Sequence, residues 1–77
     1  MQPKKLTRHA KNRMRMHGIT EAEVDSAIER PDFTEPSVEG RVNVWKKVDD
    51  KFLRVTLKDE QRRLLIITAV KKKKGWR

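Results

Sequence analysis

Two histidines and an arginine recur at intervals of four residues near the start of the chain, at His9, Arg13 and His17. Residues four apart share one face of a helix, so the spacing predicts a helix with imidazole and guanidinium groups on one side. Histidine moves protons near neutral pH, and arginine stabilises phosphate charge. The stretch is therefore either a candidate site for phosphate chemistry or a polar seam whose partners lie within the fold.

The two histidines are too far apart to act together. Eight residues of helix rise by about 12 Å, which excludes a shared metal ion or an acid–base pair on one phosphodiester. No suitably spaced carboxylate completes a zinc site, so we expect no metal and no cofactor. His9 is the better catalytic candidate, because Arg13 lies one turn away. His17 stands next to Gly18 and is expected at most to cap the helix end.

Arg13 falls near the centre of the apolar face of this helix. The other members of that face are Leu6, Ala10, Met14 and Met16. A buried arginine without a partner is costly, so Arg13 must find an anion, backbone carbonyls or a sheet edge. Two interpretations stay open: a phosphate clamp held by packing, or a structural arginine paired within the fold.

Capping residues mark two helices. Thr7 is a suitable N-cap for the first helix, which is expected to end at about His17. Thr20 and Glu23 have the spacing of a capping box at the start of the second helix, and Pro31 ends it. A loop follows over residues 31–40, with room for a short edge strand around residue 33.

From residue 42 onward the apolar pattern changes to a period of two, which predicts strands. A two-residue turn at Asp49 and Asp50 brings the patterns of the two strands into agreement in one register. That register pairs Val44 with Val55 and Val42 with Leu57 on one face, and Trp45 with Arg54, Lys47 with Phe52 and Asn43 with Thr56 on the other. It also sets Lys46 opposite Leu53, at the rim of the apolar face.

Residues 64–70 are apolar on both faces and predict an interior strand. The expected fold is an α+β domain over residues 1–70, with two N-terminal helices packed on one face of a three- or four-stranded antiparallel sheet. Residues 71–77 are expected to form a basic, frayed tail.

The second face of the sheet is a candidate nucleic-acid interface. Aromatic rings stack on bases and cations neutralise phosphates, so Trp45, Phe52, Arg54 and Lys47 could form a binding platform. Alternatively, Trp45 covers the sheet and Arg54 stacks on it as a cation–π pair. The run Lys71, Lys72, Lys73 and Lys74, with Trp76, favours polyanion contact, or it only keeps the chain soluble.

The composition sets limits on the class of protein. The chain has 77 residues, a net charge of +9 and a hydrophobic share of only 35%, so its core must be thin. The absence of cysteine and of a long apolar run predicts a cytoplasmic protein without a membrane span. Basic residues dominate both ends while residues 19–40 are acidic, which suggests one surface turned toward a polyanion.

The first half of the chain resembles a family of small bacterial proteins known as domain of unknown function number 4258. The matching motifs are His9-Ala10, Arg13-Met14, His17-Gly18-Ile19-Thr20, Glu23-Val24, Ala27-Ile28 and Pro31-Asp32, followed by the strand Ile66-Ile67-Thr68-Ala69-Val70. The resemblance covers about residues 7–70. The family is in turn similar to toxins of the RelE/ParE and BrnT types, which have a RelE-like α+β fold and act on RNA without a metal.

The resemblance implies an RNA-directed role with RNA or the ribosome as partner. Arg54 and Arg13 would then stabilise phosphate charge, while His9 or Lys46 would move protons. Two departures stand against cleavage: the chain contains no tyrosine, which such toxins often use, and it has no apparent room for a strand before the helices. Three hypotheses follow: a toxin-like endoribonuclease, a non-enzymatic nucleic-acid-binding or regulatory module, and a partner-binding protein covered by an acidic antitoxin-like chain. The oligomeric state stays open.

Overall fold

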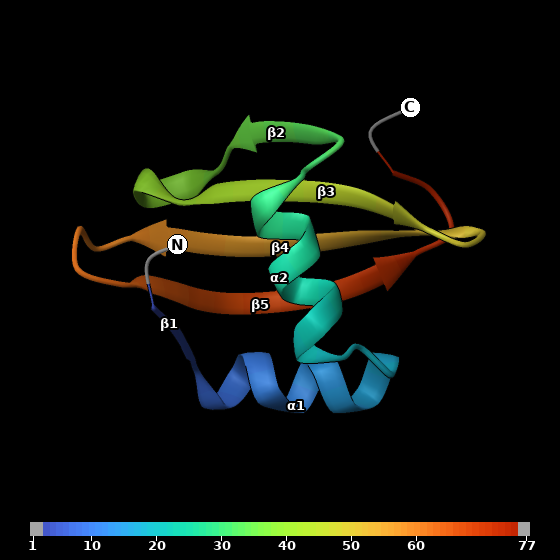
Figure 1. Ribbon diagram of the computed structural model, residues 1–77, viewed down its shortest axis with the longest axis horizontal. Helices are drawn as coiled ribbons and strands as arrows, with labels where there is room; N and C mark the ends of the chain where they lie inside the picture. The colour runs from blue at the N-terminus through green and yellow to red at the C-terminus, as the bar shows by residue number, and fades with distance from the viewer. Residues whose placement is uncertain (1–2, 76–77) are drawn as a thin grey trace.

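The computed structural model describes residues 3–75, which form two helices and one five-stranded sheet (Figure 1). In chain order the elements are β1 (Lys4–Leu6), α1 (Arg8–His17), α2 (Glu21–Glu29), β2 (Phe33–Pro36), a 3₁₀ turn (Val38–Gly40), β3 (Val42–Val48), β4 (Lys51–Asp59) and β5 (Leu64–Lys72). The sheet order is β1-β5-β4-β3-β2. The class is α+β, as expected.

Strand β1 corrects the predicted topology in two respects. It precedes both helices, where no strand was expected, and it pairs parallel to β5, so the sheet is mixed rather than antiparallel. The short edge strand expected around residue 33 is present as β2 at the opposite edge, so β1 is the strand that brings the sheet to five instead of three or four. A three-residue strand has no periodicity of its own. Its partners lie about sixty residues away, at Leu64–Ile66.

The helix boundaries agree with the predicted caps. The Thr7 hydroxyl accepts a hydrogen bond from the Ala10 N–H at 3.0 Å, and Gly18 ends α1 in the left-handed conformation with φ 65°. Thr20 and Glu23 form the complete capping box at the start of α2. Local polar contacts therefore define both helices.

The hairpin of β3 and β4 has the predicted register. Val44 pairs with Val55, Trp45 with Arg54, Lys46 with Leu53 and Lys47 with Phe52, across the turn at Asp49 and Asp50. The prediction of an interior last strand is also confirmed, because β5 lies between β1 and β4. It continues over Lys71 and Lys72, the first two residues of the segment expected to form a tail.

The core lies between the helices and one face of the sheet. Helix α2 crosses that face, while α1 lies along β5 (Figure 1). The buried apolar residues are Ala10, Met14, Ile19, Val24, Ala27, Val44, Leu53, Val55, Leu57, Leu64, Ile66 and Ala69. Met16, predicted on the apolar face of α1, is 72% exposed, because the helix buries only a narrow stripe through Ala10 and Met14.

Candidate nucleic-acid interface

The sheet face turned away from the core, called the outer face below, carries the residues predicted to bind nucleic acid. Successive side chains of a strand point to opposite faces, and Val44, Leu53 and Val55 belong to the core. Their neighbours along the strands therefore form the outer face. From this alternation and the register, its polar and aromatic members are Lys5, Phe33, Glu35, Asn43, Trp45, Lys47, Phe52, Arg54, Thr56, Lys58, Thr68 and Lys72.

A hydrogen-bonded network occupies the middle of the outer face. One carboxylate oxygen of Glu35, Oε2, accepts hydrogen bonds from the Trp45 indole N–H at 2.9 Å and from the Asn43 side-chain amide at 3.1 Å. The Thr56 hydroxyl donates to the Asn43 amide oxygen at 2.7 Å. The network spans β2, β3 and β4, so it fixes the indole of Trp45 in one orientation.

Glu35 was not among the predicted site residues. The hydrogen bonds from Trp45 and Asn43 stabilise its charged form and, with the positive charge of Arg54, lower the pKa of the carboxyl below 4.5. Because β2 has only four residues, the sequence alone offered no register that would place this carboxylate beside Asn43. Its position between Asn43 and Trp45 follows from the pairing of β2 with β3.

Arg54 lies over the Trp45 ring, with 5.8 Å between the guanidinium carbon and the ring centroid. Its Nε atom is buried and has no hydrogen-bond partner among residues 3–75. Within the same residues the guanidinium forms no ion pair, although its charge acts on Glu35. The group is thus positioned by packing, and its charge is not neutralised by a direct contact.

Of the three aromatic residues of the outer face, Trp45 is buried, Phe52 is half-buried and Phe33, opposite Trp45 on β2, is 38% exposed. Trp45 is 7% exposed, which agrees with the interpretation that it covers the sheet and supports Arg54. The ammonium of Lys47 lies 5.8 Å from the centroid of the Phe52 ring. Gly75 lies so close to this ring that a Cβ atom there would collide with it. Apart from the ring of Phe33, the outer face therefore presents cations and not open aromatic rings.

The four candidate catalytic residues are spread over three elements, α1, β3 and β4. Arg54 is on the outer face, whereas Lys46 lies on the core side of β3 and donates to the Arg30 carbonyl at 2.9 Å, next to the end of α2. His9 is exposed and Arg13 is half-buried, both on α1. Within residues 3–75 no hydrogen bond or ion pair joins His9, Arg13 or Lys46 to Arg54, so the structure does not assemble these four side chains into one site.

Arg13 has neither of the internal partners that a structural role predicts. Its guanidinium forms no ion pair or hydrogen bond with the residues that the structure describes. Since the group is only half-buried, water can hydrate it. No contact within residues 3–75 therefore supports the structural interpretation of Arg13.

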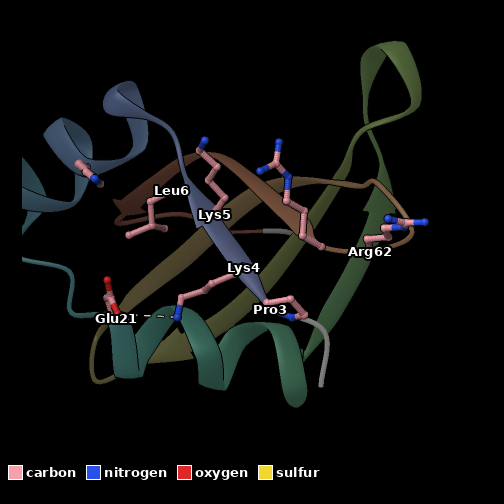
Figure 2. Close-up of a pocket in the computed structure, with 8 residues that line it drawn as sticks. Pro3, Lys4, Lys5, Leu6, Glu21 and Arg62 are labelled. Carbon is pink, nitrogen blue, oxygen red and sulfur yellow. Dashed lines mark ion pairs between the residues drawn. The ribbon is translucent and has the colours of Figure 1, made fainter.

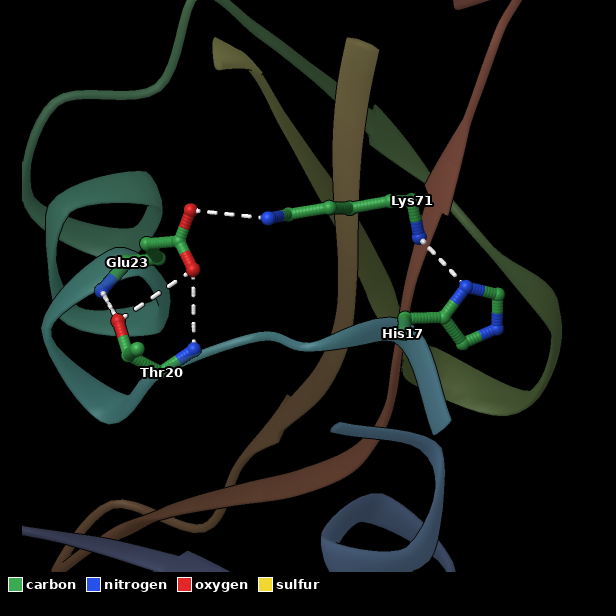
Figure 3. A network of polar contacts seen from close by, with 4 residues as sticks. All are labelled: His17, Thr20, Glu23 and Lys71. Atoms are coloured by element: carbon green, nitrogen blue, oxygen red, sulfur yellow. Dashed lines mark hydrogen bonds and ion pairs between the residues drawn. The ribbon is translucent and has the colours of Figure 1, made fainter. Parts of the chain in front are cut away.

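His17 and Lys71 have structural contacts instead. His17 Nδ1 accepts a hydrogen bond from the Lys71 backbone N–H at 3.4 Å, and the Lys71 ammonium lies 3.1 Å from the Glu23 carboxylate (Figure 3). Lys71 thus differs from Lys72, Lys73 and Lys74, which are exposed and form no ion pair within the described part of the chain. Trp76 lies outside the described residues.

Residues 3–75 hold no group of three or more histidine, cysteine, aspartate or glutamate side chains that could bind a metal ion. Among them there is also no helix with the length and apolar character needed to cross a membrane.

Comparison with known proteins identifies a family but no function. A family model described as "Domain of unknown function (DUF4258)" matches residues 6–71, which is most of the chain, so the protein belongs to this family. No curated protein matches the sequence, and no solved structure matches it.

Proposed function

We propose that this member of the DUF4258 family binds RNA through phosphate contacts made by the cations of the outer face. One observation carries the proposal. The strands place five cations on this face but only one carboxylate, that of Glu35; the cations are Lys5, Lys47, Arg54, Lys58 and Lys72. None of the five forms an ion pair within residues 3–75.

The spacing of these cations favours an extended polyanion. Lys72 on β5 pairs with Phe52 on β4, and Phe52 lies six residues before Lys58 on the same strand. The cations Lys72 and Lys58 are therefore about 20 Å apart along the strand direction. A single phosphate group cannot reach both ends of such a row, whereas a nucleic-acid strand can. The sequence resemblance to toxins that act on RNA favours RNA over DNA as the strand.

The proposal is tested by fluorescence anisotropy with single-stranded RNA over a range of salt concentrations. Each phosphate contact to a single strand contributes about 0.7 to the salt slope. The variant Arg54→Gln/Lys58→Gln should bind at least tenfold more weakly, with a slope reduced by about 1.4 for two lost contacts. Duplex DNA of the same length shows whether RNA is preferred.

The matched control is Arg30→Gln/Lys51→Gln, which removes the same charge from two exposed side chains that are not on the outer face. It should change RNA affinity by less than threefold. Equal losses in the two variants would attribute binding to net charge, and absence of RNA binding by the wild-type protein would overturn the proposal.

Metal-independent cleavage of RNA is a second candidate function. It is favoured by the placement of a carboxylate, Glu35, and a guanidinium, Arg54, on one face, since these groups can move a proton and stabilise phosphate charge. Cleavage that persists in EDTA and is lost in both Arg54→Gln and Glu35→Gln would support it. Intact RNA after incubation, with and without ribosomes, would rule it out.

In the cell, RNA binding by this protein would serve a toxin-like role, and an acidic antitoxin-like protein would be its partner. This role rests on the resemblance to the RelE/ParE and BrnT types and on the basic outer face, which an acidic chain would also fit. Growth inhibition on expression, relieved by the product of an adjacent gene, is the expected result. Normal growth would leave an RNA-binding protein without toxicity.

A further inference from the structure

A basic cavity lies at the opposite edge of the sheet from β2, between β1, the start of α1 and the turn that joins β4 to β5 (Figure 2). Its volume is about 600 Å³, within the range of roughly 300–1,000 Å³ that ligand pockets have. The lining consists of the cations Lys4, Lys5, Lys11, Arg62 and Arg63, the carboxylate of Glu21, and the apolar residues Pro3 and Leu6.

Two of the five cations are already paired. The Lys4 ammonium lies 2.9 Å from Asp25 and 3.7 Å from Glu21, and in Figure 2 its side chain extends toward Glu21. Arg63 Nε lies 3.0 Å from the Glu60 carboxylate. The one carboxylate that lines the cavity therefore has a cation of its own, which weakens its repulsion of an incoming anion.

Three cations of the cavity are left without such a pair. Lys5, Lys11 and Arg62 are exposed, and none forms an ion pair within residues 3–75. They come from three different segments, namely β1, the first half of α1 and the turn before β5. Bringing three like charges to one cavity is unfavourable by itself, and a bound anion removes the repulsion.

The N-terminus of α1 adds to the positive potential here. Residues Leu6 and Lys11, on either side of this terminus, line the cavity, and the first turn of α1 contains no acidic residue. The positive end of the helix dipole is thus not compensated by a carboxylate of its own helix. This contribution supports the cations and does not replace them.

We propose that the cavity is a binding site for phosphate groups, and that it takes a ligand with two or more adjacent phosphates. Three unpaired cations match several negative charges better than one carboxylate, and arginine and lysine are the side chains that bind phosphate oxygens. The same chemistry is offered by a free oligophosphate and by the backbone of an RNA strand.

Sodium tripolyphosphate, titrated at about physiological ionic strength and followed by calorimetry and by amide NMR shifts, tests the free form. We expect saturable binding, with the largest shifts around Leu6, Lys11 and Arg62. In Lys11→Gln/Arg62→Gln the affinity should fall at least tenfold. In the control Arg30→Gln/Lys51→Gln, with the same loss of charge, it should change less than twofold.

The second arm uses single-stranded RNA with hydroxyl ends and rests on the proposed function. Tripolyphosphate could fail to bind while Lys11→Gln/Arg62→Gln still loses more RNA affinity than the control variant does. That result would assign the cavity to the backbone phosphates of RNA. The proposal is overturned when neither probe distinguishes this variant from the control. The outer-face variant Arg54→Gln/Lys58→Gln should bind tripolyphosphate normally, so failure of the cavity and failure of the outer face can be told apart.

Discussion

Nδ1 of His17 accepts the backbone N–H of Lys71 at 3.4 Å, which attaches the end of α1 to β5. The start of α1 is attached as well, because Thr7 donates its backbone N–H to Ile66 O at 3.1 Å and its hydroxyl to Ile67 O at 3.0 Å. Helix α1 therefore lies along the edge of β5 beyond the three residues that β1 pairs. Covering this edge protects it from pairing with another chain.

Thr7 should contribute to stability through both of its roles, as the cap of α1 and as the link to β5. Replacement by valine keeps the shape but removes the hydroxyl that accepts from Ala10 and donates to Ile67. Loss of the cap alone costs about 0.5–2 kcal/mol, so we expect Thr7→Val to lower the unfolding free energy by about 2 kcal/mol in urea denaturation. Thr7→Ser retains the hydroxyl and should stay within about 0.5 kcal/mol of wild type. Equal stability of the two variants would contradict the dual role.

Glu23 should make stability depend on pH in the acid range. The hydrogen bond from the Thr20 backbone N–H, aided by Lys71, lowers the pKa of Glu23 below 4.5 in the folded protein. A lowered folded pKa means that this stabilisation is present above pH 4.5 and is lost as the pH falls through the folded value.

Two substitutions separate the contributions of Glu23. Glutamine can complete a capping box, so Glu23→Gln should lose only the ion pair with Lys71, about 0.2–1 kcal/mol, together with its share of the acid dependence. Glu23→Ala should lose about 1 kcal/mol more, because the cap also goes. Urea denaturation at pH 7 and pH 3 measures both effects. A pH dependence unchanged in Glu23→Gln would contradict the assignment.

The sequence predicted those features of the fold whose determining residues lie within one segment or one hairpin. The capping box of Thr20 and Glu23 is local, and the alternations of β3 and β4 agree in a single register, so these features were predicted correctly. The pairing of β1 with β5 joins segments about sixty residues apart, and no pattern in three residues indicates it. The cavity that β1 forms with residues 62 and 63 was missed for the same reason.

In the candidate site too, contacts within the hairpin were predicted and contacts between distant segments were not. The facing of Trp45 and Arg54 follows from the hairpin register and was predicted. Lys46 was placed correctly on the apolar side, but a sequence pattern cannot show that its ammonium turns to the Arg30 carbonyl and away from the outer face. Glu35 was missed because its neighbours depend on the pairing of β2, which only the folded chain defines.

Glu35 should report its own titration through Trp45. The Trp45 indole N–H donates to the Glu35 carboxylate at 2.9 Å, and this bond, with that from Asn43, lowers the pKa of Glu35 below 4.5. The Trp45 indole N–H signal in NMR should therefore shift as the pH falls, with a midpoint below 4.5. Any stability that the charged carboxylate contributes is lost over the same range. In Glu35→Gln the acid shift should disappear, and its persistence would show that another group is responsible.

Arg54 is expected to favour binding at some expense of stability. A buried polar group without a partner costs about 1–3 kcal/mol, and the Arg54 Nε is such a group within residues 3–75. The cation–π contact with Trp45 stabilises the folded protein by only about 0.5–1 kcal/mol at a partly exposed site. Methionine fills a similar volume without a buried donor, so Arg54→Met should raise the unfolding free energy by about 1 kcal/mol.

The same substitution should weaken RNA binding by at least tenfold, because a phosphate contact is lost from the outer face. Lys58→Met is the matched control: it removes an exposed cation from the same face, so it should weaken binding without raising stability. Urea denaturation and anisotropy on the three proteins decide the matter. A destabilised Arg54→Met with unchanged RNA affinity would make Arg54 a structural partner of Trp45, and the outer face would lose its best-positioned phosphate ligand.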